Sequence, residues 1–200
     1  MKLFTKAFLV PVIAGTMWAC SESKSNPADS YFEDGQFEKA AEGYTEELKF
    51  KPNDVKLLYN RGRAWQELAN YDKARADFGA ALSQDPKNFQ VLLSLALIQL
   101  EDKNYASALL YATKAEEISG APADASFLKA RALHQLGMTG DALKAYGNAI
   151  SLDKDFAQAY FNRGILKIAL DQTKDACEDF KLAAALDYPG ASDQLAKYCR

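Results

Sequence analysis

The sequence is poor in β-branched residues and has no excess of positive charge. Four valines, six isoleucines and six threonines among 200 residues exclude a protein built around a sizeable β-sheet. The 24 Lys and Arg stand against 27 Asp and Glu, so we expect no nucleic-acid partner. Eleven glycines and six prolines give no bias toward disorder. The 34 alanines, by contrast, favour an all-α chain.

Residues that carry catalysis or bind metals are also scarce. The single histidine, His134, has no recognisable catalytic or metal-binding partner set in the sequence. A Gly-rich phosphate-binding loop and a Cys-x-x-Cys motif are both missing. We therefore expect a protein that is not an enzyme, needs no cofactor or metal, and takes no small-molecule substrate.

The N-terminus, MKLFTKAFLVPVIAGTMWAC, has the layout of an export signal. Lys2 and Lys6 precede an apolar run, residues 7–18, which is too short to span a bilayer comfortably. A small residue and then Cys20 follow, before a polar stretch. This arrangement resembles a bacterial lipoprotein signal peptide, residues 1–19. The resemblance implies that Cys20 is lipidated, for example with palmitate, and becomes the mature N-terminus.

The match to the lipoprotein pattern is incomplete. Met17 and Trp18 stand where that family usually carries Leu and a small residue, whereas Ala19 and Cys20 fit. Cleavage near Ala19 that leaves a free thiol, or an uncleaved anchor, are the alternatives. In this family the residue after the cysteine influences sorting, and Ser21 resembles that of lipoproteins sent to the outer membrane. The resemblance thus implies a lipid-anchored protein of the bacterial cell envelope, on the outer membrane and facing the periplasm.

The rest of the chain repeats with a period of 34 residues. Alanines recur at this interval, at Ala40, Ala74, Ala108, Ala142 and Ala176. Four positions after each alanine stand mostly aromatic residues, Tyr44, Phe78, Ala112, Tyr146 and Phe180. Twelve positions before each of the last four alanines stands a small residue, Gly62, Ala96, Ala130 and Gly164. Small residues let helix backbones approach closely and aromatic residues fill the remaining space, so the pattern is typical of stacked helix pairs.

This pattern resembles the tetratricopeptide repeat (TPR), a helix-turn-helix unit of 34 residues. The resemblance implies a right-handed α-solenoid over residues 28–190. Its units are 21–54, which is partial, 55–88, 89–122, 123–156 and 157–190. Residues 20–27 are expected to be a polar tether, which reaches about 20 Å when extended. Residues 191–200 carry apolar side chains at helical spacing and are expected to form a capping helix.

Cys177 and Cys199 remain once Cys20 is lipidated. If the chain turns over residues 187–190, an antiparallel helix hairpin brings Cys177 and Cys199 to the same height, which favours a disulfide in an exported protein. The alternative is two small thiols packed in a helix interface.

In TPR proteins the first helix of each pair lines a concave face, and ligands commonly contact particular positions on it. Mapped onto this chain, those positions give a candidate groove for a protein or peptide: Tyr59, Asn60, Arg63, Leu93, Leu97, Phe127, Arg131, His134, Phe161 and Asn162. The groove would supply aromatic anchors, Asn60 and Asn162 as hydrogen-bonding groups, and Arg63 and Arg131 for a carboxylate. The alternative is that these residues only maintain the scaffold.

His134 is expected in the groove wall, with its protonation disfavoured by Arg131 one turn earlier. Chaperone-binding TPR domains hold a terminal carboxylate with a clamp of Lys and Asn side chains. The fifth residue of the 34-residue unit, which carries Lys in that clamp, is never Lys in this chain, so the clamp is absent. The sequence thus predicts an envelope-tethered scaffold or assembly adaptor that binds another protein. An assembly lipoprotein similar to the pilotins or to those of the outer-membrane assembly machinery is one alternative, and a structural lipoprotein with a self-occupied groove is another.

Overall fold

The computed structural model describes residues 26–199. The expected signal peptide, Cys20 and most of the expected tether lie outside the described residues. The described part folds into eleven α-helices with no β-strand, which confirms the all-helical prediction. None of its helices is both long and apolar enough to cross a membrane.

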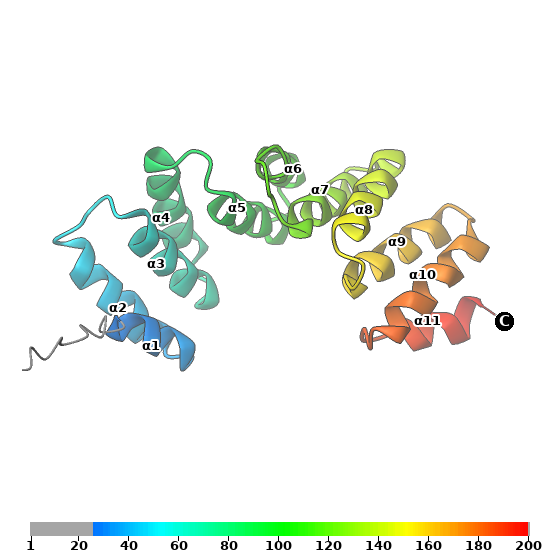
Figure 1. Cartoon of the computed structure of the whole chain (residues 1–200), viewed down its shortest axis with the longest axis horizontal. Helices are drawn as coiled ribbons and strands as arrows, with labels where there is room; N and C mark the ends of the chain where they lie inside the picture. The colour runs from blue at the N-terminus through cyan, green and yellow to red at the C-terminus, as the bar shows by residue number, and fades with distance from the viewer. Residues whose placement is uncertain (1–25, 200) are drawn as a thin grey trace, which may run out of the picture.

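The helices form five pairs and a final single helix that together build an arch (Figure 1). The pairs are α1 (Pro27–Glu33) with α2 (Phe37–Leu48), α3 (Val55–Glu67) with α4 (Tyr71–Gln84), α5 (Phe89–Glu101) with α6 (Tyr105–Glu116), α7 (Ala123–Gln135) with α8 (Thr139–Leu152), and α9 (Ala157–Ala169) with α10 (Thr173–Ala185). The final helix is α11 (Ala191–Tyr198). The first helix of one pair contacts the first helix of the next, as α3 does with α5 and α5 with α7, so these helices line the inside of the arch.

The 34-residue pattern is the packing pattern of the core. All five recurring alanines are fully buried, and so are the aromatic residues four positions later. Where the small residue twelve positions before the alanine is glycine, the aromatic ring packs against its backbone, as Phe78 does at Gly62. The stack therefore holds together through close backbone approaches that larger side chains would block.

The turn within each helix pair has a left-handed residue at the same place in the repeat. Its φ angle is positive in all five units, at Gly35, Ala69, Lys103, Gly137 and Asp171. This conformation costs a residue other than glycine about 1 kcal/mol. The fold imposes it on three side-chain-bearing residues because the turn must return the chain antiparallel to the first helix.

Two arginines at equivalent places hold their helix pairs together. Arg61 donates Nε–H and Nη2–H bonds of 2.8 and 2.6 Å to the carboxylate of Asp77, linking α3 to α4. Arg163 makes the same pair of bonds with Asp179, at 2.9 and 2.7 Å, linking α9 to α10. Both carboxylates are buried. Each bidentate pair commits the Nε–H and one Nη2–H donor of its arginine to the contact within the helix pair.

The last helix covers the C-terminal end of the stack. α11 packs on α10, and a disulfide joins Cys177 of α10 to Cys199, with 5.7 Å between the two Cα atoms. Ala191, at the start of α11, is fully buried. The bond fixes the end of α11 to the final repeat, as the spacing of the two cysteines predicts.

Candidate partner-binding groove

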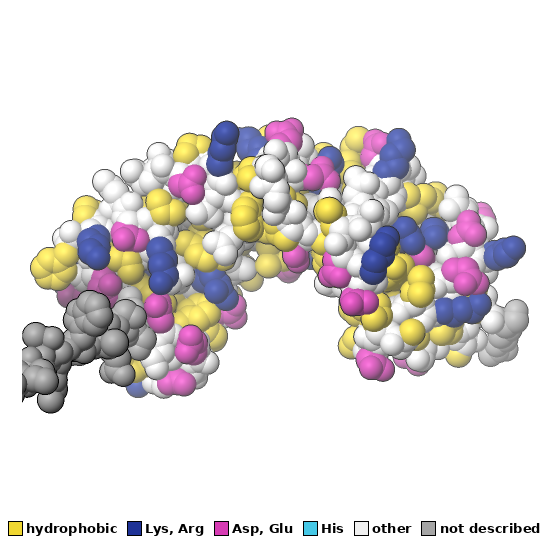
Figure 2. Space-filling model, viewed as in Figure 1, with side chains coloured by type: hydrophobic (Ala, Val, Ile, Leu, Met, Phe, Trp, Pro, Cys, Tyr) yellow, Lys and Arg dark blue, Asp and Glu magenta, His cyan; other side chains and the backbone are white. Residues whose placement is uncertain are grey.

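The first helices enclose an open hollow in the middle of the concave face, with a volume of about 520 Å³. Its apolar floor comes from α3, α5 and α7, and hydrophobic side chains are visible on the inner side of the arch in Figure 2. The residues that line it are Tyr59, Phe89, Gln90, Leu93, Ser94, Leu97, Asp124, Phe127, Leu128, Arg131 and Gln158. Five of the ten residues expected in the groove meet here: Tyr59, Leu93, Leu97, Phe127 and Arg131. We call this hollow the central groove.

One cation faces the central groove without an ion pair. Arg131 makes no salt bridge with any described residue, and its guanidinium lies 5.9 Å from the centre of the Phe127 ring. Lys129, two residues earlier on α7, instead donates a 2.6 Å hydrogen bond to Glu116. The central groove therefore combines an apolar floor with a positive charge that the fold leaves for a partner.

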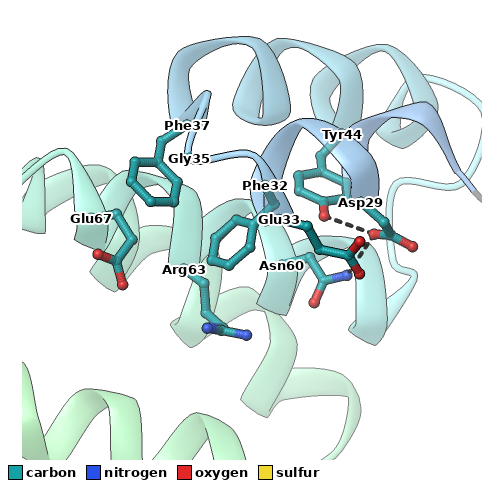
Figure 3. A pocket seen from close by; sticks show the side chains of 9 residues that line it. All are labelled: Asp29, Phe32, Glu33, Gly35, Phe37, Tyr44, Asn60, Arg63 and Glu67. Atoms are coloured by element: carbon teal, nitrogen blue, oxygen red, sulfur yellow. Dashed lines mark hydrogen bonds between the residues drawn. The ribbon is translucent and has the colours of Figure 1, made fainter.

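A second hollow lies at the N-terminal end of the same face, between α1, α2 and α3 (Figure 3). Asp29 Oδ1 accepts hydrogen bonds from the Tyr44 hydroxyl at 2.7 Å and from Asn60 Nδ2 at 3.2 Å. The guanidinium of Arg63 lies 4.6 Å from the centre of the Phe32 ring, a cation–π contact. Asn60 and Arg63 thus belong to this second hollow and not to the central groove.

Two hydrogen bonds to Asp29 join the helices around the N-terminal hollow. Burial raises the pKa of Tyr44 well above its usual range, and the hydrogen bond to the Asp29 carboxylate raises it further. Tyr44 therefore keeps its proton and stays a donor at any physiological pH. Because its carboxylate also accepts the Asn60 amide, Asp29 ties α1 to both α2 and α3.

Two of the expected aromatic contacts belong to the fold. Phe127 is only 3% exposed, with its ring centre 4.8 Å from that of Phe156 and 6.0 Å from that of Tyr146. The ring of Phe161 packs on Phe180 at 5.9 Å and on Tyr188 at 4.8 Å. Tyr188 precedes α11, so the capped end of the chain packs against Phe161, which stays half-buried.

Each of the two expected amide groups uses one of its two N–H donors within the fold. Asn162 Nδ2 donates a 2.8 Å bond to the carbonyl of Gln158, one turn earlier on α9, and Asn60 Nδ2 is bonded to Asp29. Phe161 and Asn162 lie outside both hollows. The concave face is therefore hollowed along α3, α5 and α7, and the residues expected at its C-terminal end lie outside the central groove.

His134 lies on α7 beyond the central groove. Its ring packs edge-on against Tyr146, with 6.5 Å between the ring centres. The pKa of His134 is lowered, as expected. The cause is burial of the imidazole ring, and not the nearby charge of Arg131 that the sequence suggested. Among the described residues no cluster of three or more His, Cys, Asp or Glu is placed to hold a metal ion.

The structure adds groove residues at a repeat position that the sequence could have revealed. Gln90, Asp124 and Gln158 occupy the second position of successive repeats, and all three line the central groove. This position is one of those that ligands commonly contact in TPR proteins, and following it along the chain would have found the row. Phe89 also lines the groove and was not expected to do so.

Comparison with protein families identifies the repeat. A model described as "Tetratricopeptide repeat" matches residues 59–124, and a model described as "TPR repeat" matches residues 130–171. Together the two matches cover more than half of the chain. The chain belongs to the TPR proteins. TPR domains bind protein or peptide partners, and TPR proteins are typically scaffolds without enzymatic activity.

Sequence relatives share the repeat across much of the chain. Human "Tetratricopeptide repeat protein 6" is 29% identical over 164 residues, which cover 80% of this chain and 31% of that protein. The chain spans about a third or less of the length of the curated relatives it matches first.

Two solved bacterial TPR structures share the fold. PilW, described as a widely conserved type IV pilus biogenesis factor, matches with a TM-score of 0.74 at 22% identity, over 80% of this chain and 74% of that one. The pilF protein of Pseudomonas aeruginosa matches with a TM-score of 0.75 at 17% identity, over 80% of this chain and 72% of that one.

Proposed function

We propose that this chain is an envelope-tethered TPR lipoprotein that binds a protein or peptide partner in its central groove and acts as a scaffold or assembly adaptor. The observation that carries the proposal is the central groove itself. Its half-buried leucines, Leu93 and Leu97, lie on the floor, and Arg131 stands beside them without an ion pair among the described residues. A segment with apolar side chains and a carboxylate fits this combination, because burial of the apolar groups and the ion pair would both favour binding.

The disulfide and the N-terminal sequence support the envelope location. A bond between Cys177 and Cys199 persists in an oxidising compartment and is rare in the cytosol. The lipoprotein-like signal, with Cys20 as the site of lipidation, would then hold the protein on the outer membrane, facing the periplasm.

A second candidate is an assembly lipoprotein similar to the pilotins or to the TPR lipoproteins of the outer-membrane assembly machinery. The fold shared with PilW, a type IV pilus biogenesis factor, is the reason to test the first of these. A structural lipoprotein with a self-occupied groove is less well supported. Among the described residues the chain packs against Phe161 through Tyr188 and leaves the central groove open.

The groove proposal is tested by reversing one charge. Arg131→Glu should abolish recovery of the partner that copurifies with the tagged protein from its own cells, because the partner's carboxylate would then face a like charge. Lys144→Glu, on the exposed surface of α8, is the matched control and should leave recovery unchanged. Equal recovery with both variants would contradict the proposal.

The lipid anchor is tested separately. Palmitate should label the native chain in cells but not the Cys20→Ser variant, and that variant should leave the membrane fraction. Equal labelling of the two chains would count against lipidation at Cys20.

A further inference from the structure

The connection between α2 and α3 carries an exposed aromatic side chain, Phe50, between two lysines. Phe50 is 86% exposed, more than any other large hydrophobic residue among the described ones, the next being Leu152 at 64%. Lys49 and Lys51 stand on either side of it in the chain and are also exposed. Exposing a phenylalanine to water is unfavourable, and nothing in the described part of the chain covers this one.

The start of α1 lies beside this connection. Ala28, in the first turn of α1, packs so tightly on α2 that a Cβ atom on Gly43 would stand 2.8 Å from its Cβ. Gly43 is seven residues before Phe50, which is about 10 Å along a helix axis. Asp29 Oδ2 also lies 3.8 Å from Lys56 Nζ, in the first turn of α3. Figure 1 shows α1, α2 and the α2–α3 connection at the same end of the arch.

Of the two lysines that flank Phe50, one has no ion pair with a described residue. Lys49 Nζ bonds to Glu46 at 2.6 Å, one turn back on α2, whereas Lys51 has no ion pair with a described residue. The carboxylate of Asp54 accepts the backbone N–H of Leu57 and caps α3. An aromatic ring between two lysine side chains suits the interface of a lipid bilayer. There the ring is buried at the edge of the acyl chains and the lysine ammonium groups reach the lipid phosphates.

We propose that residues 49–51 contact the surface of the bilayer, with the Phe50 ring at the acyl boundary. The inference rests on the proposed lipid anchor, because Cys20 is only seven residues from Pro27 at the start of α1. An extended segment of that length reaches about 20 Å, which keeps the first repeat near the membrane. The contact would give the solenoid a defined orientation, with the first repeat at the membrane and later repeats extending away from it.

Equivalent positions in three repeats provide sites at which a fluorophore can report the distance to the membrane. Phe50, Gln84 and Leu152 all occupy position 30 of the 34-residue repeat, and all three are exposed. Gln84 and Leu152 end their helices, and Phe50 lies two residues after the end of α2. With Cys20 lipidated and Cys177 bonded to Cys199, a cysteine placed at one of these positions is the one thiol free for labelling. The variants Phe50→Cys, Gln84→Cys and Leu152→Cys should fold alike because none of these side chains is buried.

The experiment places each labelled, lipidated full-length chain in vesicles of phosphatidylethanolamine and phosphatidylglycerol that contain nitroxide-labelled lipid. An aromatic fluorophore at position 50, which replaces the Phe50 ring with another ring, should be quenched at least about threefold more strongly than one at position 152, with position 84 between them. Equal quenching at positions 50 and 152 would overturn the contact. Quenching that depends on protein concentration and not on lipid would show that a second copy covers Phe50, and would also overturn it.

A second measurement separates this inference from the proposed anchor. If the Cys20→Ser variant shows the same membrane-bound fraction and the same palmitate labelling as the native chain, both the anchor and the contact fail. If the anchor holds, Phe50→Ser should remove the protection of residues 49–51 from hydrogen exchange on vesicles, while Gln84→Ser should not. Unchanged protection in Phe50→Ser would overturn the contact alone.

Discussion

The ring of Phe78 lies directly against the backbone of Gly62. A Cβ atom at Gly62 would stand 2.6 Å from Cε1 of that ring, which is closer than side-chain atoms pack. Gly164 and Phe180 repeat the relationship in the last helix pair, where the corresponding distance is 2.7 Å. The glycine and the aromatic ring of these two units are therefore complementary, and neither can be enlarged alone.

Gly62→Ala should destabilise the protein by about 1–3 kcal/mol, because the added methyl group forces the Phe78 ring from its place. Urea unfolding monitored by circular dichroism measures the change. Gly79→Ala is the control: a Cβ there meets nothing within 4 Å, so the variant should gain about 0.5–1 kcal/mol from helix propensity. A Gly62→Ala variant as stable as Gly79→Ala would contradict this packing.

Lys103→Gly should stabilise the protein by about 1 kcal/mol. Lys103 is exposed and holds a φ angle of 58°, so glycine removes backbone strain without loss of a contact. Gly137→Ala, at the equivalent turn, should lower stability by a similar amount because its φ angle is 74°. Thermal unfolding of the two variants checks the opposite signs, and a loss of stability in Lys103→Gly would refute the argument.

Replacing Cys177 and Cys199 by serine should cost about 3 kcal/mol, the entropy expected for a loop of this length. Hydrogen exchange should accelerate mainly in α11, since the bond fixes that helix to α10. Thiol labelling of the denatured, unreduced native protein is the direct check. Two reactive thiols at these positions would show that the bond does not form.

The protein should lose stability on acidification partly through His134. Burial lowers its pKa, so below the usual value of about 6.5 the unfolded chain binds a proton that the folded chain does not. Stability is then lost as the pH falls from that value through the lowered pKa. His134→Gln should lose less stability than the native chain over this interval in urea titrations at several pH values. Parallel pH profiles would show that His134 does not contribute.

The periodic pattern was sufficient to predict the stack of helix pairs. Residues such as Ala142 and Tyr146 mark contact positions by their type and spacing alone, and the structure buries both. The left-handed turn was not predictable in the same way. Ala69, Lys103 and Asp171 do not favour that conformation, and only the antiparallel return of the chain imposes it.

The groove was predictable as a set of positions but not as a surface. Leu93 and Leu97 line it because their repeat positions face inward. The packing of Phe161 depends on Tyr188, which lies outside the regular helices and whose position follows from how α11 caps the stack. Which groove residues remain open is therefore set by tertiary contacts between irregular segments, and repeat positions do not encode these.

Site-specific photo-crosslinking in cells tests the central claim most directly. A photoreactive amino acid at Leu97, in the central groove, should crosslink one discrete partner, and Arg131→Glu should abolish that product. The same amino acid at Leu110, exposed on α6 outside the groove, should not give this product. A product that forms equally from both positions, or that survives Arg131→Glu, would contradict the proposal that the concave groove binds the partner.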